Sequence, residues 1–100
     1  MMSIAGREPV LWVDAVSLLG SGGYAEESMQ RWNRALLAAC RHYPAMRVFD
    51  WAALAKRRWF IADGIHYTSP GYVRRTHVIA QALVKAFPDG LPASGTCVVR

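Results

Sequence analysis

The chain has 100 residues, of which 53% are hydrophobic and 19% are charged, and its formal net charge is +5. This length allows one domain at most, and the composition is that of a folded protein and excludes a disordered one. Charged residues interrupt the long apolar runs, so we expect no membrane span of about 20 residues. The N-terminal residues lack the pattern of a secretory signal, which leaves the cellular location open.

Two cysteines, Cys40 and Cys97, provide neither a disulfide framework nor a recognisable metal-binding spacing. We therefore expect two separate thiols, no bound metal and no cofactor.

The positive charge is concentrated at residues 56–58 and 74–75, with Trp59 beside the first cluster. Interleaved basic and aromatic residues are typical of single-stranded nucleic-acid sites. No DNA- or RNA-binding motif accompanies them, however, so a solvated basic surface is the better interpretation.

Two short apolar runs predict strands. Residues 10–16, VLWVDAV, are rich in branched side chains and predict a strand buried on both faces, and residues 47–51, RVFDW, predict a second strand. A long helical pattern separates the two runs. We therefore expect one right-handed βαβ unit with parallel strands, which places the chain in the α/β class.

The helical pattern consists of apolar residues that recur at intervals of three and four. Glu26 and Glu27 fall in the first turn and Arg41 and His42 in the last, as the helix dipole favours, and Pro44 ends the helix. The expected apolar face consists of Met29, Trp32, Leu36, Cys40 and Tyr43.

Residues 52–59 predict a short helix or a helical turn, and a loop follows it. A second long helix is predicted after Ser69 and Pro70, which are its expected N-cap and first-turn residues, and residues 88–90 end it. His77 lies in the apolar face of this helix, where a packed or hydrogen-bonded structural histidine is a better interpretation than a catalytic one. The expected buried face consists of Val73, Thr76, His77, Ala80, Leu83, Val84 and Phe87.

Asp63 and His66 lie three positions apart on the loop DGIHYTSPG, residues 63–71. A carboxylate that accepts the Nδ1 proton of a histidine fixes its tautomer and leaves Nε2 free to take a proton. The pair would then be the acid and the base of a hydrolytic triad. Two ligands are too few for a metal site, and a plain turn with a surface histidine is the alternative that so short a motif leaves open.

The surroundings of this pair make the motif more specific. D-G-I-H is followed by T-S-P-G and an amphipathic helix, and it is preceded by a V-F-D-W strand and a W-N-x-x-L helix. The arrangement resembles the C-terminal part of the SGNH (GDSL-like) esterase and acyl-hydrolase family, most closely the hydrolase domains that accompany membrane O-acyltransferases of cell-surface polysaccharides. The resemblance implies that His66 is the general base and Asp63 its orienting acid, and that Gly71 matches a glycine often found after this block.

The resemblance covers residues 10–88 and implies a three-layer α/β/α fold around a parallel sheet. For this chain we expect a partial, flavodoxin-like version with one βαβ unit and a C-terminal helix. Residues 1–9 would form an N-terminal lead and residues 89–100 a tail, in which residues 96–99 suggest an edge strand.

No nucleophile can be assigned. The family's G-D-S block, its oxyanion-hole glycine and its G-x-N-D block are not found in this chain, and none of the six serines stands in a setting that activates its hydroxyl. We therefore expect a C-terminal fragment of an esterase, inactive alone. Its expected partner is an N-terminal SGNH segment or another chain at an open sheet edge, and the expected substrate of the completed enzyme is an acylated carbohydrate.

Two alternatives belong to other functional classes. Gly20-x-Gly22-x-x-Ala25 matches the dinucleotide fingerprint between a strand and a helix, and Asp50 follows the next strand, where a ribose-binding acid is expected. Against this, three residues separate the strand from the first glycine and Glu26 would face the pyrophosphate, so a connecting loop is the better interpretation. The second alternative is a non-catalytic interaction module.

Overall fold

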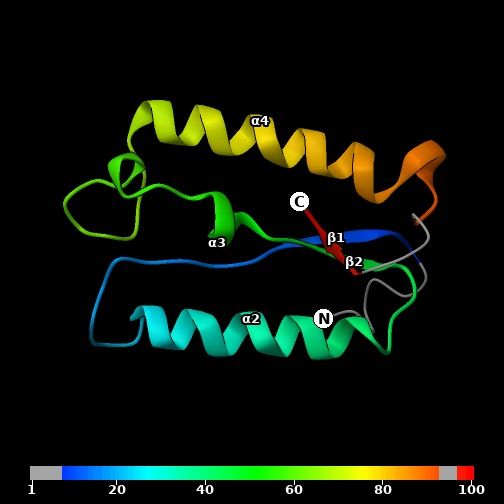
Figure 1. Ribbon diagram of the computed structural model, residues 1–100, viewed down its shortest axis with the longest axis horizontal. Coiled ribbons are helices and arrows are strands. Elements are labelled where there is room, and N and C mark those ends of the chain that lie inside the picture. Colours follow the sequence, from blue (N-terminus) through cyan, green and yellow to red (C-terminus); the bar gives the residue numbers. More distant parts are fainter. Residues whose placement is uncertain (1–7, 93–96) are drawn as a thin grey trace.

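The computed structural model describes residues 8–92 and 97–100, which form a mixed α/β fold (Figure 1). β1 (Val10–Val13), β2 (Met46–Phe49) and β3 (Val98–Val99) form one sheet in the order β1-β2-β3. β2 is parallel to both of its neighbours. The predicted pairing of the first two strands and the predicted edge strand are therefore confirmed, although residue 96 lies outside the described residues.

Two long helices, α2 (Glu26–Cys40) and α4 (Ser69–Ala86), cover opposite faces of this sheet (Figure 1). Shorter turns follow β2 and α4: α3 (Trp51–Leu54), η1 (Arg57–Trp59) and η2 (Pro88–Gly90). The result is the expected partial α/β/α arrangement around a short parallel sheet. Within the described part of the chain, no helix is both long and apolar enough to span a membrane.

The core has two parts, one on each face of the sheet. The part under α2 contains Leu36, Cys40, Met46 and Val48. The part under α4 contains Phe49, Trp51, Val78 and Ala82. β2 contributes to both because successive side chains of a strand point to opposite faces. Full burial of a large apolar side chain contributes about 1.5–3 kcal/mol, so this four-residue strand is central to the stability of the fold.

β1 and β2 both end earlier than the sequence predicts. β1 ends at Val13 instead of residue 16, and β2 ends at Phe49, after which the chain turns into α3. Beyond β1 the side chain of Asn33 makes two hydrogen bonds to the main chain of Ala15. Its Nδ2 donates to the carbonyl at 2.7 Å and its Oδ1 accepts the N–H at 2.8 Å. A side-chain amide therefore replaces the strand ladder at this point. β1 is also only half-buried, because it is the edge strand of the described sheet.

The helical segments also end at residues other than those that the sequence predicts. α2 begins with Glu26 and Glu27 as predicted but ends at Cys40, so Arg41 is its C-cap and His42 lies outside it. The N–H groups of these two residues donate to carbonyls three positions back, which tightens and closes the last turn. The short helix or helical turn predicted over residues 52–59 is two separate turns, because Ala55 adopts an extended conformation.

α4 buries a different face from the one that the sequence predicts. Val73 and Val84 are 71% and 72% exposed, and His77 is exposed as well, so the prediction of a packed structural histidine is wrong. Small side chains let this helix approach the aromatic core closely, and the bulkier stripe faces away. The buried face consists of Gly71, Val78, Ala82 and Ala86. Of the predicted face, Phe87 alone is half-buried.

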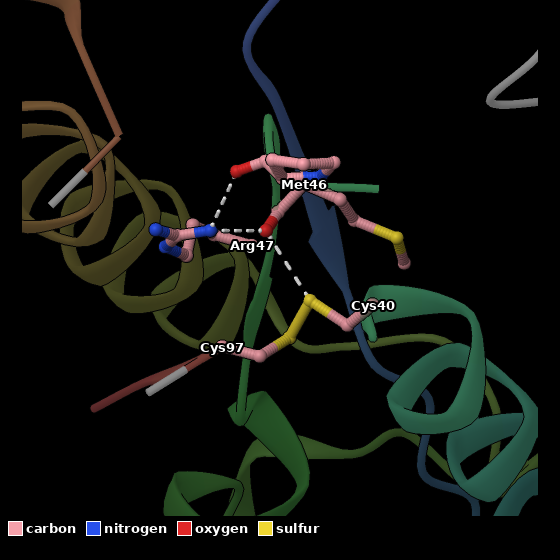
Figure 2. Close-up of a disulfide and its surroundings, with 5 residues drawn as sticks. Cys40, Met46, Arg47 and Cys97 are labelled. Carbon is pink, nitrogen blue, oxygen red and sulfur yellow. Dashed lines mark hydrogen bonds between the residues drawn. A yellow bond between two sulfur atoms is a disulfide. The ribbon is translucent and has the colours of Figure 1, made fainter. Parts of the chain in front are cut away.

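Cys40 and Cys97 form a disulfide, so the prediction of two separate thiols is wrong (Figure 2). Their Cα atoms are 6.2 Å apart, and the bond spans a sequence separation of 57 residues. Sγ of Cys40 lies 3.2 Å from the carbonyl oxygen of Met46, and the carbonyl of Cys97 accepts the N–H of Val48 at 3.1 Å. The disulfide thus fixes β3, a strand of only two residues, to the end of α2.

Replacement of both cysteines by alanine should lower the free energy of unfolding by about 4 kcal/mol, the chain-entropy value for a loop of this length. Urea unfolding at pH 7 measures this change. The N–H groups of Val48 and Asp50, which donate to carbonyls of residues 97 and 99, should lose protection from hydrogen exchange.

A reducing agent provides the control. It should bring the native chain to the stability of the double variant and should leave that variant unchanged. A native chain that keeps its stability under full reduction would contradict the structural role of the disulfide.

Candidate functional site

The loop between η1 and α4 carries both residues of the D-x-x-H motif and lies at the end of the molecule toward which β1 and β2 run (Figure 1). Its base is closed by an antiparallel bridge between Phe60 and Tyr67. At its tip Gly64 has φ +73°, a left-handed conformation that favours glycine. The carbonyl of Gly64 accepts the N–H of Leu18 at 2.9 Å, which ties the loop to the segment that follows β1.

Asp63 and His66 are in direct contact on this loop. Nδ1 of His66 lies 2.6 Å from Oδ2 of Asp63, which is the distance expected between a histidine and its orienting acid. The other oxygen, Oδ1, accepts the N–H groups of Ile65 at 2.8 Å and of His66 at 2.9 Å. The side chain of His66 is 64% exposed, so the imidazole is open to solvent.

These hydrogen bonds set the charge of the acid. The Ile65 N–H, and then the side chain and N–H of His66, lower the pKa of Asp63 to about 2. Asp63 is therefore a carboxylate at neutral pH and can accept the Nδ1 proton of its neighbour.

The start of α4 holds the C-terminal end of this loop. Its N-cap is Thr68, whose Oγ1 accepts the N–H of Gly71 at 3.0 Å. Ser69, the predicted N-cap, is instead the first helical residue, and Pro70 lies in the first turn as predicted. A Cβ on Gly71 would lie 2.7 Å from the carbonyl oxygen of Trp59, so only glycine lets α4 pack this closely on η1.

Among the described residues, no serine hydroxyl makes a hydrogen bond to His66. Ser17 is 4% exposed, and its hydroxyl donates to the carbonyl of Tyr24 at 2.5 Å. Its role is to hold the turn that precedes α2. Ser3 and Ser94 lie outside the described residues.

The glycine-rich loop has the geometry of a connector. A Cβ on Gly20 or Gly22 would meet nothing within 4 Å, so no neighbour requires glycine there, although Gly22 has φ +89°. Oε1 of Glu26 accepts the N–H of Ser17 at 3.3 Å at the start of α2. This places a carboxylate where the fingerprint would place a pyrophosphate, which a helix N-terminus binds through its free N–H groups.

The basic residues at positions 56–58 are exposed, as expected for a solvated surface. The neighbouring ring of Trp59 is stacked on Trp51, with centroids 5.7 Å apart and planes at 9°. Because this ring already belongs to the protein's own aromatic cluster, the geometry gives no support for a base-stacking role.

A second pair of acids, which the sequence analysis did not recognise as a pair, lies at the carboxyl edge of the sheet. Asp14 and Asp50 directly follow the paired strands β1 and β2. Asp14 is 8% exposed and accepts the N–H of Ala52 at 2.8 Å, whereas Asp50 lies 3.1 Å from Nε of Arg100. An acid directly after each of two parallel strands is the signal that could have indicated this pair.

The two acids line a cavity of about 280 Å³ between α2 and the sheet, and neither Asp63 nor His66 is among its lining residues. Burial raises the pKa of Asp14 to about 7; the N–H of Ala52 opposes this, and a hydrogen bond to Asp50 and repulsion from it add to it. In the described part of the chain, no group of three or more His, Cys, Asp or Glu residues could hold a metal ion.

The raised pKa of Asp14 makes stability depend on pH. Below its ordinary value of 3.8 both the folded and the unfolded chain hold the proton, so the contribution of Asp14 is complete there and is lost as pH rises toward 7. We expect Asp14→Asn, which keeps the acceptor for Ala52 and a donor toward Asp50, to remove this loss. Relative to the variant, the native chain should lose on the order of 2 kcal/mol between pH 4 and pH 8, after allowance for solvent screening.

Urea unfolding of both chains at pH 4, 5, 6, 7 and 8 measures the difference. Asp14→Ala serves as the control: it also removes the titration but leaves the Ala52 N–H unpaired, so it should be less stable than Asp14→Asn at every pH. Parallel pH profiles for the native chain and Asp14→Asn would show that Asp14 does not titrate in this range.

No family model matches the chain, and neither the curated proteins nor the solved structures contain a match to it. The resemblance to SGNH hydrolases therefore rests on the D-x-x-H loop and on the order of the elements around it.

Proposed function

We propose that this chain is the C-terminal portion of an SGNH-type acyl hydrolase and supplies its base and its orienting acid. The observation that carries the proposal is the contact of 2.6 Å between Nδ1 of His66 and Oδ2 of Asp63. A carboxylate held by three donors beside an exposed imidazole is the arrangement that general-base catalysis requires.

The chemistry follows from this geometry. Asp63 accepts the Nδ1 proton, so Nε2 of His66 carries the free lone pair and takes the proton of an attacking serine hydroxyl. Asp63 then stabilises the imidazolium, which returns the proton to the leaving alcohol. Because the pKa of Asp63 is lowered to about 2, it keeps its charge throughout the neutral range.

No described serine contacts His66, so the proposal takes the nucleophile from another segment, and two surfaces of the chain support such a partner. Among the described strands, β1 pairs with β2 alone, and no described strand lies along its outer edge, where another chain could add one. Beside it, Trp12 and Trp32 line an apolar cavity of about 210 Å³. On the other side of the sheet, α4 exposes the apolar side chains of Val73 and Val84 to solvent. An N-terminal SGNH segment that adds strands beyond β1 would cover this edge and the cavity beside it.

The substrate class, an acylated carbohydrate, rests on the resemblance alone. The disulfide adds a constraint on where the chain works, because disulfides persist in oxidising compartments. An esterase that acts on surface polysaccharides would work in such a compartment.

A non-catalytic interaction module is the second candidate. It is favoured by the same exposed stripe on α4, which an isolated monomer leaves in water. Size-exclusion chromatography distinguishes the two: a module that pairs with itself elutes as a dimer, whereas an incomplete hydrolase forms a complex only with its missing segment.

The chain alone should hydrolyse p-nitrophenyl acetate no faster than free imidazole at equal concentration, because no described serine contacts His66 and the sequence holds no recognisable oxyanion-hole block. Addition of an N-terminal segment that carries the G-D-S, glycine and G-x-N-D blocks, by fusion or as a second chain, should produce esterase activity. His66→Ala should abolish it, and Asp63→Asn should reduce turnover greatly, on the order of 10⁴ in the related serine-protease triad.

His42→Ala is the matched control, because His42 is also an exposed imidazole but lies beyond the C-terminal end of α2. This variant should keep full activity. Activity that survives His66→Ala, or serine-reagent-sensitive turnover by the chain alone, would refute the proposed roles.

A further inference from the structure

Tyr67 directly follows His66, yet the two side chains have opposite surroundings: His66 is exposed and Tyr67 is half-buried. The ring of Tyr67 lies in a cluster of aromatic side chains. Its centroid is 4.9 Å from that of Phe60, 5.2 Å from that of Tyr72 and 5.7 Å from that of Trp51. The residue next to the candidate base is thus packed into the protein.

The polar end of Tyr67 is held as well. Nε1–H of Trp51 donates to its hydroxyl oxygen at 2.8 Å. Trp51 is 1% exposed and begins α3 immediately beyond β2, so the core of the sheet sets its position. From α4, the guanidinium of Arg75 lies 5.8 Å from the centroids of both rings and closes the cluster.

The contacts of the catalytic pair do not reach this core. The hydrogen bonds of Asp63 all lie within residues 63–66, so they fix the imidazole relative to the loop and not relative to the sheet. Main-chain bonds at Gly64 and Thr68 join the loop to neighbouring loops and to η1. The bond between Trp51 and Tyr67 adds a side-chain connection from the loop to the buried end of β2.

We propose that Tyr67 is a positioning residue: by accepting the hydrogen bond of Trp51, it holds the loop that carries Asp63 and His66 against the core. The inference rests on the proposed function for the roles of that pair. Without the phenol oxygen, a buried indole N–H would have no acceptor, and the loop would have to shift or admit water to satisfy it.

Tyr67→Phe tests this, because it removes the hydroxyl and keeps the ring. Tyr72→Phe is the matched control, since Tyr72 packs on the same cluster but its hydroxyl makes no hydrogen bond within the described residues. In the 100-residue chain, NMR should show the N–H groups of Ile61 and Thr68 exchanging about tenfold faster in Tyr67→Phe, because the loop separates from the core more often. Tyr72→Phe should leave this exchange unchanged.

Unchanged exchange in Tyr67→Phe would overturn the proposal, and so would equal changes in Tyr72→Phe, which would indicate general packing instead. If Tyr67→Phe does not fold, the native chain decides: the indole N–H of Trp51 should exchange at the same rate as the N–H groups of Ile61 and Thr68, because one opening exposes all three. Independent exchange would contradict the proposal.

These measurements need no enzymatic activity. Failure of the complementation experiment would therefore refute the hydrolase assignment while leaving the positioning role intact. Conversely, esterase activity that depends on His66, together with an unaffected loop in Tyr67→Phe, would refute the positioning role alone.

Discussion

β2 is the element on which both faces of the molecule depend. All four of its residues pair with β1, and Val48 and Phe49 also pair with β3. Its side chains enter the core under α2 and the core under α4. The chain immediately beyond it supplies Asp50 to the acid pair and Trp51 to the aromatic cluster. Both candidate sites are therefore anchored at the carboxyl end of one strand, the position at which open parallel sheets bind their ligands.

The two sites use carboxyl groups in opposite ways. Asp63 is exposed to solvent and accepts hydrogen bonds from Ile65 and His66, so its pKa is lowered to about 2 and it keeps its charge. Asp14 is buried beside another acid, so its pKa is raised to about 7. The first environment suits an acid that orients a base, whereas the second creates a group that exchanges a proton near neutrality. Environment, and not residue type, separates their chemistry.

A chain of this size buries little surface, and the structure combines three features that follow from that limit. A disulfide fixes a two-residue strand that hydrogen bonds alone would hold weakly. The outer edge of β1 pairs with no other described strand, and α4 presents a stripe of apolar side chains to water. An uncovered strand edge and exposed apolar side chains both favour association of an isolated domain with another chain.

Sequence alone determined what depends on local spacing. The period of the apolar residues predicted both long helices and the parallel pair of strands, and the D-x-x-H spacing predicted a contact between Asp63 and His66, because three residues of a tight loop bring the two side chains together. Only the tertiary structure decided what depends on distant partners. The face that α4 buries follows from the close approach that Ala82 and Gly71 allow. The disulfide and the bond between Trp51 and Tyr67 join residues 57 and 16 positions apart, for which a single sequence carries no periodic signal.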